Sequence, residues 1–494
     1  MKITNYQKYR LLEMIPGLTT WLTIILVFVL SFIKPLWMVY FVIAFDFYWL
    51  MRVIYFISYL AYSWQRFRTE KVMDWLGKVK SIKDWQKINH LVFLPTHQDD
   101  IKVLQSTFQA LIKSDYPLDK IMIVLAGEEA DKDSFLKNME IIKREYSNYF
   151  HRFIVTIHPK NVSGEVAGKG SNINYSGKLV KKIIDEMRIP YENIIVSTFD
   201  IDTCVYKHYF SYLTYKYLTH PNPTHTSYQP LALYNNNIWE SPSFTRVVAN
   251  STTFWLMTDL ARPERLFTFS SHSMSFKALV DVGFWQNDIV TEDSRIFLQC
   301  FLYYDGNYTV TPMFVPVSMD TAYSGKLWDT VKNQYKQIRR WAWGVEHFPY
   351  MIWHFSKAKK IPWQKKFKYL WNITEGMYSW ATVPILIFIL GRLPLIMASA
   401  DEKSSVIAQN TPYVLQWLMS FAMVGILASA VLNVFFLPGR PPKHQIYKIP
   451  VMVLQWALLP ITLIIFGSIP AIDAQTRLML GKYLGFYTTK KTRN

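Results

Sequence analysis

The sequence IIVSTFDID at residues 194–202 sets a buried strand directly before two carboxylates. Residues 194–198 are apolar or β-prone and predict the strand, and Asp200 and Asp202 follow where it ends. In open sheets of parallel strands, ligands bind at the carboxyl ends of the strands. This stretch therefore predicts an α/β fold and marks the two aspartates as candidates for chemistry.

Upstream, short apolar runs alternate with amphipathic segments in the same way. We expect strands at residues 91–94, 121–125 and 153–157, and helices at 101–113, near Ile141, and from a glycine-rich turn at 168–170 to about Met187. This order is typical of a parallel sheet covered by helices. The residues after Leu125 and after Thr198 should then share one ligand-binding edge.

Five apolar stretches flank this region, at residues 18–33, 36–62, 378–397, 414–437 and 449–469. Each is close to the roughly 20 residues that cross a bilayer core. Between them, residues 65–326 have an ordinary globular composition. The sequence therefore predicts two membrane helices, a soluble domain and three further apolar helices. We expect the first stretch to be retained as an anchor, because no small-residue cleavage site follows it.

The distribution of charge predicts the orientation in the membrane. The net charge is +18, and basic residues crowd the segments 66–80 and 357–368. Such residues accumulate on the cytoplasmic side, so both ends of the soluble domain are expected there. The excess charge indicates contact with anionic lipids rather than nucleic acid. The two cysteines, Cys204 and Cys300, do not indicate a disulfide framework.

The side on which the C-terminal tail lies is open. If all three of the last apolar stretches cross the membrane, the basic tail at 471–494 falls on the far side, against the positive-inside tendency. The stretch that contains Pro460 could instead re-enter and return to the same side, provided that protein covers its backbone.

Two aspartates at this spacing can share one hard cation with the oxygens of a diphosphate. A lone pair of this kind is more often a solvated turn, so its context matters. Downstream come Thr291-Glu292-Asp293 and then Gln337-Ile338-Arg339-Arg340-Trp341. Because these motifs follow Asp200-Ile201-Asp202 in this order, a chance pair in a solvated turn is a poor explanation of the two aspartates.

In the order and spacing of these motifs, the sequence resembles the inverting family 2 glycosyltransferases of the cellulose synthase and hyaluronan synthase type. That family carries an early acidic motif, a lysine–asparagine turn, DxD, TED and, at the membrane surface, QxxRW. The resemblance covers about residues 91–344. It implies an α/β fold in which a cytosolic GT-A-type (Rossmann-like) glycosyltransferase domain is inserted between transmembrane α-helices.

The resemblance also implies a role for each matching residue. It implies that Asp200 and Asp202 bind the divalent metal, Mg²⁺ or Mn²⁺, and that Asp293 is the general base, positioned by Glu292 and Thr291. It also implies that Trp341 stacks on the acceptor sugar. The residues that it implies for donor binding are Lys169, Asn172, Asn174, Asp200, Gln337 and Arg340. The chemistry agrees with these roles. Displacement at an anomeric carbon needs a base on one face and a stabilised leaving group on the other. A single displacement inverts the centre, so an α-linked donor would give a β-linked product.

Two segments depart from the family pattern. Ala126-Gly127-Glu128-Glu129 stands where the family has DDG, and either Glu128 or Glu129 could contact the base or ribose of the nucleotide. In Phe269-Ser270-Ser271-His272-Ser273, His272 could contact an acceptor hydroxyl or be a structural histidine. Both pairs of alternatives stay open at this point.

The segment around QxxRW divides into three faces at about 100° per residue. The apolar face holds Leu327, Val331, Ile338, Ala342 and Val345, the basic face Lys332, Lys336 and Arg339, and the third face Gln337, Arg340, Trp341 and Gly344. We expect an interfacial helix whose apolar face lies in the bilayer and whose third face meets the soluble domain. The alternative, a core helix with a solvated charged side, explains the first two faces but gives no reason for Trp341. In the second apolar stretch, Asp46 and Arg52 are costly in hydrocarbon. They should line a path for a glycan or pair with neighbouring helices.

The expected organisation is a tail and two transmembrane helices at 1–63, a cytosolic catalytic domain at 64–325, amphipathic interfacial helices at 326–372, about three transmembrane or re-entrant helices at 373–470, and a basic tail at 471–494. The expected reaction transfers a sugar from a UDP-linked or related nucleotide-sugar donor to a polysaccharide end or a lipid-linked acceptor. The expected location is the inner or plasma membrane, with membrane lipids as partners, no nucleic acid, and a homo-oligomer left open. The alternative is a non-catalytic transporter or sensor that binds nucleotide sugar.

Overall fold

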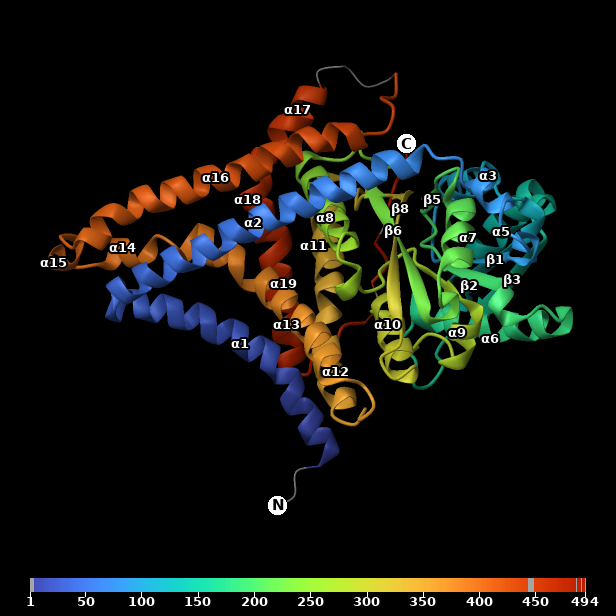
Figure 1. Ribbon diagram of the computed structural model, residues 1–494, viewed down its shortest axis with the longest axis horizontal. Coiled ribbons are helices and arrows are strands. Elements are labelled where there is room, and N and C mark those ends of the chain that lie inside the picture. The colour runs from blue at the N-terminus through green and yellow to red at the C-terminus, as the bar shows by residue number, and fades with distance from the viewer. Residues whose placement is uncertain (1–3, 443–447, 486, 490, 494) are drawn as a thin grey trace.

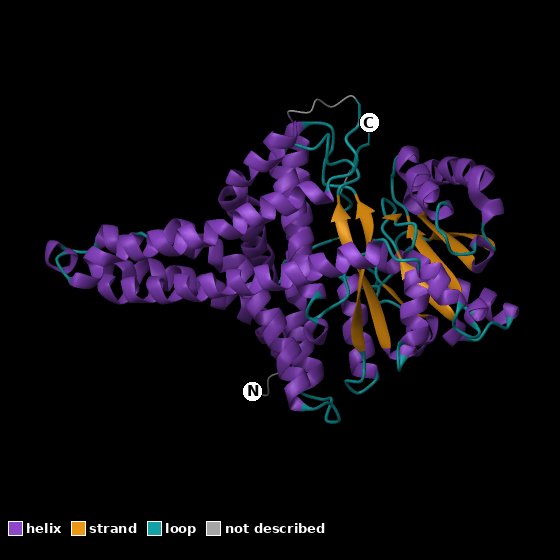
Figure 2. Ribbon diagram, turned by 45° about the horizontal axis from the view of Figure 1, so that its top comes forward, coloured by secondary structure: helices purple, strands orange, loops and turns teal. Residues whose placement is uncertain are grey.

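The computed structural model describes residues 4–442, 448–485, 487–489 and 491–493. A mixed α/β domain carries the strands, and a bundle of long helices extends from one side of it (Figure 1). All strands lie on the domain side, whereas the extension consists of helices and their connections (Figure 2). The predicted insertion of an α/β domain between apolar helices is confirmed in this arrangement.

Within the described residues, one eight-stranded sheet has the order β3-β2-β1-β4-β7-β6-β8-β5. Its strands are β1 (Asn89–Pro95), β2 (Ile121–Glu128), β3 (Arg152–His158), β4 (Ile194–Thr198), β5 (Cys204–Val205), β6 (Thr226–Tyr234), β7 (Ser273–Ser275) and β8 (Thr309–Met319). The first four strands pair in parallel, as predicted. Beyond β4 the sheet is mixed, because β7 runs antiparallel to both β4 and β6.

The predicted strands and helices form because their apolar residues are buried together. Residues 91–94 of β1 and 121–125 of β2 are fully buried in the main core. At the edge of the sheet, Asp100 caps α4 (Ile101–Ile112) by accepting a hydrogen bond from the Lys102 amide (2.9 Å), as N-cap aspartates do. The other helices of the domain are α3 (Trp75–Lys80), α5 (Lys132–Tyr146), α6 (Lys169–Met187), α7 (Tyr209–Thr219), α8 (Ser243–Leu260), α9 (Phe276–Asp281) and α10 (Glu292–Tyr303).

Five helical segments in the described residues are long and apolar enough to cross a membrane. The first two, α1 (Asn5–Ile33) and α2 (Pro35–Lys71), form one hairpin (Figure 1). The second hairpin runs outward through α13 (Trp363–Ile385) and α14 (Leu393–Met397), turns at α15 (Ala400–Lys403) and returns through α16 (Val406–Phe436) (Figure 1). The last segment, α17 (Lys448–Leu454), α18 (Leu459–Leu463) and α19 (Ile469–Met479), lies between these hairpins and the sheet (Figure 1).

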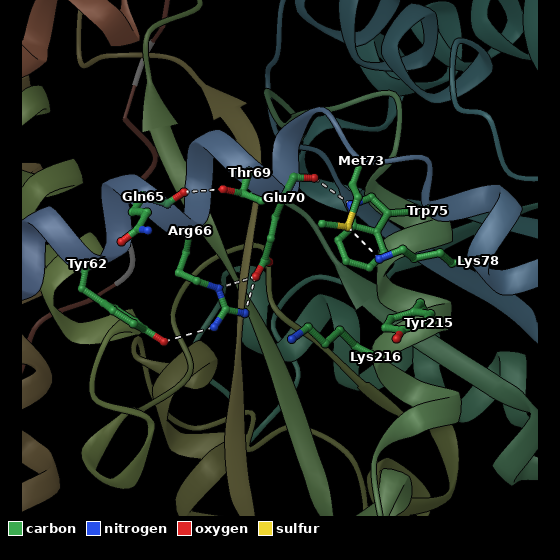
Figure 3. Close-up of a pocket in the computed structure, with 10 residues that line it drawn as sticks. All are labelled: Tyr62, Gln65, Arg66, Thr69, Glu70, Met73, Trp75, Lys78, Tyr215 and Lys216. Atoms are coloured by element: carbon green, nitrogen blue, oxygen red, sulfur yellow. Dashed lines mark hydrogen bonds and ion pairs between the residues drawn. The ribbon is translucent and has the colours of Figure 1, made fainter.

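Hydrogen bonds join the end of α2 to the α/β domain. The Glu70 carboxylate accepts a hydrogen bond from Arg66 Nε (2.6 Å) and another from the Tyr212 hydroxyl on α7, and the Glu70 carbonyl oxygen accepts from Trp75 Nε1 (2.7 Å). Arg66, Glu70 and Trp75 line a cavity of about 470 Å³ (Figure 3). Because α2 continues to Lys71, the membrane hairpin and the domain are joined by one helix rather than by a linker.

The helix that carries QxxRW, α11 (Leu327–Ala342), is followed by α12 (His347–Phe355). The expectation that its apolar face lies in the bilayer is wrong for the C-terminal half of the helix. Ile338 packs with Phe466, and Ala342 packs with Ala471 and Ala474 of the last helical segment. Arg339 also pairs with Asp473 (2.8 Å). The fifth apolar stretch covers this face, which sequence periodicity could not distinguish from lipid.

Candidate active site

Lys169 joins the two acidic motifs. Its Nζ lies 2.7 Å from Asp200 Oδ1 and 2.9 Å from each carboxylate oxygen of Asp293. The three residues come from the first turn of α6, the end of β4 and the first turn of α10. Gly170 permits this approach, because a Cβ at that position would lie 3.2 Å from Glu292 Cβ. The structure thus brings DxD, the lysine turn and TED to one point.

The electrostatics of this contact favour the charged forms of both partners. Burial disfavours the ammonium of Lys169, but Asp200 and Asp293 outweigh it and raise the pKa of the lysine. Burial likewise disfavours the Asp200 carboxylate, yet Lys169, Lys491 and the Ser270 hydroxyl hold its pKa below the usual range. An opposite charge at hydrogen-bond distance is the physical cause in each case.

The second aspartate of DxD contacts the C-terminal tail. Asp202 is 1% exposed, and its Oδ2 accepts hydrogen bonds from the Asp320 amide and from Lys491 Nζ, both at 2.7 Å. Arg493 donates to the Asp320 carboxylate (2.8 Å) and to the Asp202 carbonyl oxygen (3.0 Å). The tail therefore lies against the α/β domain.

The carboxyl groups around DxD fit a divalent cation that a substrate helps to coordinate. No group of three or more His, Cys, Asp or Glu residues in the described part of the chain could hold a metal alone. Asp200 and Asp202 already contact ammonium groups, so cations are favoured there. Burial, with these aspartates, raises the pKa of neighbouring Asp99 to about 7. Mg²⁺ commonly uses one or two carboxylates and completes its shell with phosphate oxygens and water, which this donor set allows.

Thr291 and Glu292 do not contact the Asp293 carboxylate. The Thr291 hydroxyl donates to Glu346, and within the described residues neither carboxylate oxygen of Glu292 has a hydrogen-bond partner. Burial and the nearby Asp293 raise the pKa of Glu292 to about 8. The backbone of Asp293 is instead held by the Thr268 hydroxyl, which donates to its carbonyl oxygen (2.6 Å).

His272 is fully buried, and its Nδ1 donates to the Phe269 carbonyl oxygen (2.9 Å). The same nitrogen lies 3.8 Å from Asp293 Oδ1. Burial lowers the pKa of the imidazole, and the side chain lies outside the lining of a second, larger cavity, which contains Asp200, Asp202 and Asp293. Of the two alternatives in the sequence, the structural histidine fits this position better than a direct acceptor contact.

The structure separates the residues expected to bind the donor. Glu128 lines the cavity and pairs with His158 (3.0 Å), whereas Glu129 accepts from the Lys160 amide (2.9 Å) outside the lining. Asn172 lines the cavity and donates to the Ala126 carbonyl oxygen (3.1 Å). Asn174 turns away and donates to the Trp285 carbonyl oxygen.

One cavity of about 1770 Å³ connects these groups with the QxxRW helix. Asp200, Asp202, Asp293 and Trp341 all line it. Gln337, Arg340 and Gly344 line it too, so the third face of α11 meets the α/β domain, as predicted for the soluble domain. The Trp341 ring lies 5.8 Å from that of Tyr234, at the end of β6.

Several residues of the site were missed by the sequence reasoning. Asp99 follows β1 at the same edge of the sheet as the residues after Leu125 and Thr198, so the strand-end rule could have found it. Ser270 donates a hydrogen bond to Asp200 (2.8 Å), and Asp320 follows β8. The sequence predicts no strand next to either residue, so the strand-end rule does not find them. Lys491 carries no local signal for its position beside Asp202.

Comparisons with known proteins define the class. The sequence profile of glycosyl transferase family group 2 matches residues 195–468, more than half of the chain. The chain therefore belongs to this family of glycosyltransferases.

The chain is also similar to two solved structures. A mannosyltransferase from Pyrobaculum calidifontis in complex with GDP-Man and Mn²⁺ is 15% identical, covering 80% of this chain and 99% of its own, with a TM-score of 0.43. TarS 1–349 from S. aureus in complex with UDP-GlcNAc is 11% identical, covering 72% and 93%, with a TM-score of 0.36. No curated protein matches the chain. At these values the two similarities carry no conclusion about the substrate of this chain.

Proposed function

We propose that the chain is a membrane-bound, metal-dependent, inverting glycosyltransferase of the cellulose synthase and hyaluronan synthase type. It transfers a sugar from a UDP-linked or related nucleotide-sugar donor to a polysaccharide end or a lipid-linked acceptor and forms a β-linkage. The observation that carries the proposal is the contact of Lys169 with both Asp200 and Asp293 in a cavity that also contains Trp341. The side chains proposed to stabilise the leaving group, to act as the base and to bind the acceptor therefore line the same cavity.

On the donor side, Asp200 and Asp202 would hold Mg²⁺ or Mn²⁺, and Glu128 and Asn172 would face the nucleotide. When bound, the metal supplies positive charge that neutralises the departing diphosphate. Arg340 lines the same cavity and adds a planar donor that suits phosphate oxygens. As the bond from the anomeric carbon to the diphosphate oxygen breaks, its electron pair leaves with the diphosphate.

On the acceptor side, Asp293 takes the proton from the acceptor hydroxyl while that oxygen bonds to the anomeric carbon. Asp293 lies in the first turn of α10, with both carboxylate oxygens 2.9 Å from Lys169 Nζ. Trp341 and Tyr234 offer aromatic rings for the acceptor sugar. Attack opposite the leaving group inverts the anomeric centre.

The arrangement of the chain ends supports a specific membrane topology. Arg10, in the second turn of α1, donates to the carbonyl oxygens of Leu478 and Met479 at the end of α19 (3.0 Å each), and the tail reaches Asp202. Both ends and the catalytic domain thus lie on one side, which we assign to the cytoplasm of an inner or plasma membrane. The chain then crosses the membrane an even number of times. Each of the two hairpins crosses it outward and back, and α17–α19 packs beside α11 and begins and ends on the cytoplasmic side.

The test uses purified protein in lipid with Mg²⁺ or Mn²⁺ and a panel of nucleotide sugars, with nucleotide release and product length as readouts. Asp293→Asn should lower release by about 10²–10⁴-fold, the usual contribution of a general base, and leave nucleotide binding intact. Asp305→Asn, just beyond the end of the same helix and ion-paired with Lys360, is the control and should keep activity.

A transporter or sensor would instead tolerate Asp293→Asn. The enzymatic proposal fails if wild-type protein releases nucleotide from no donor, with or without lipid acceptors.

A further inference from the structure

The large cavity continues from the carboxylates toward the membrane helices. Beyond Trp341 its lining becomes apolar and comes from α2, from the segment after α13 and from α16, with Leu50, Val53, Phe388, Met419 and Met423. Polar residues therefore occupy one end and hydrocarbon side chains the other. A ligand that fills the whole cavity must be amphiphilic.

Three arginines also line the cavity: Arg52 of α2, and Arg262 and Arg265, which follow α8. Arg52 and Arg262 both lie over the rings of Tyr55 and Phe56, at 5.0–5.8 Å. The three guanidinium groups therefore form one cluster, which we call the arginine cluster.

The arginine cluster has fewer acidic partners than positive charges. Glu375 of α13 lies between Arg52 (2.8 Å) and Arg265 (3.8 Å), and Asp259 pairs with Arg262. Two carboxylates thus face three guanidinium groups. Asp46 also lines the cavity, about 9 Å further along α2 at 1.5 Å per residue.

Hydrogen bonding in the cluster is incomplete as well. Within the described residues, Arg52 Nε, Arg262 Nη1 and Arg265 Nε have no hydrogen-bond partner, although Arg262 is only 2% exposed. Burial, together with the neighbouring Arg262, lowers the pKa of Arg265. Buried donors normally have acceptors, and an exception calls for a ligand or a role. An anion with several oxygens would supply both the missing charge and the missing acceptors.

We propose that the arginine cluster binds the phosphate or diphosphate of a long-chain lipid that carries the acceptor glycan. This inference rests on the proposed function and selects the lipid-linked acceptor over a free polysaccharide end. The glycan then extends toward Asp293, and the hydrocarbon chain lies between α2 and α16. Arginine forks match phosphate oxygens in pairs, whereas an uncharged polysaccharide would leave the cluster unsatisfied.

The spacing along the chain agrees with this placement. Arg265 lies three residues before Thr268, whose hydroxyl donates to the Asp293 carbonyl oxygen. Three residues of extended chain span at most roughly 10 Å. The proposed phosphate site is therefore close to the base along the chain.

The test measures binding of a polyprenyl phosphate to the full chain in nanodiscs, without donor or metal, by native mass spectrometry. Arg52→Gln and Arg265→Gln should each bind about tenfold more weakly, the size of one hydrogen bond to a charged group. Glu375→Gln should bind more tightly, because it removes a competing carboxylate from the arginines. Arg68→Gln, exposed in the last turn of the same helix as Arg52, is the matched control and should bind as the wild type does.

The choice of ligands separates the sources of phosphate. Neutral polyprenol, phosphatidylglycerol and inorganic phosphate should each compete poorly with polyprenyl phosphate. Equal competition by phosphatidylglycerol would identify a general phospholipid site and overturn the proposal, as would equal binding of polyprenol or unchanged binding by both arginine variants. Because no donor is present, arginine-dependent binding would stand even if no nucleotide sugar were ever turned over.

Discussion

Replacement of Lys169 by glutamine removes a cation that contacts both Asp200 and Asp293, and its effect can be worked out from the structure. The lysine side chain is 7% exposed, and those of Asp200 and Asp293 are 28% and 20% exposed. Loss of one partner from a buried ion pair costs about 3–5 kcal/mol, and the partial exposure of the aspartates favours the lower figure. For a domain of this size, about 3 kcal/mol corresponds to a fall in Tm of roughly 6–12 °C.

Tryptophan fluorescence during thermal unfolding measures this shift in detergent-purified protein. Mn²⁺ should raise the Tm of Lys169→Gln more than that of the wild type, because a metal restores positive charge beside Asp200. Lys181→Gln is the control, since Lys181 lies on the same helix in an exposed pair with Asp185, and it should change little. An unaltered Tm for Lys169→Gln, or equal stabilisation of both proteins by Mn²⁺, would refute the role given to this contact.

Three further predictions concern neighbouring groups. The pKa of Glu292 is raised from 4.5 to about 8, so between these pH values the folded state keeps a proton that the unfolded chain releases, and stability falls as pH rises. Glu292→Gln should therefore show a flatter dependence of Tm on pH. An unchanged slope would contradict the raised pKa of Glu292. Lys491→Gln should lower the Mn²⁺ concentration for half-maximal nucleotide release, because its ammonium contacts Asp202; a higher requirement would contradict this. Trp341→Ala should raise the acceptor KM about two- to tenfold, as expected for loss of one aromatic contact, and an unchanged acceptor KM would argue against stacking there.

The parallel half of the sheet could be predicted because its strands are short, apolar and regularly alternate with helices. The other half could not. β6 contains Pro230, where its register with β8 shifts, and β8 contains Pro312 and Pro316. Proline inside a run argues against a strand because it removes a ladder donor. Both strands are nevertheless buried in the core, so tertiary packing overrode the local signal.

The candidate site shows the same division. Asp200, Asp202 and Asp293 could be found because each belongs to a short motif at the end or beginning of a recognisable element. The approach of Lys491 to Asp202 spans 289 positions of the chain, and no spacing rule connects them. The same limit applies to α11, whose apolar face looks alike whether lipid or the last helical segment covers it.

The central claim is that donor and acceptor meet in the cavity where Lys169 links Asp200 to Asp293. The most direct test is a cryo-EM structure of the Asp293→Asn protein with Mn²⁺ and a nucleotide sugar that the wild type turns over. We predict that the metal and diphosphate lie against Asp200 and Asp202 in place of Lys491, with the anomeric carbon facing residue 293. A nucleotide bound elsewhere, or an anomeric carbon directed away from residue 293, would contradict the account.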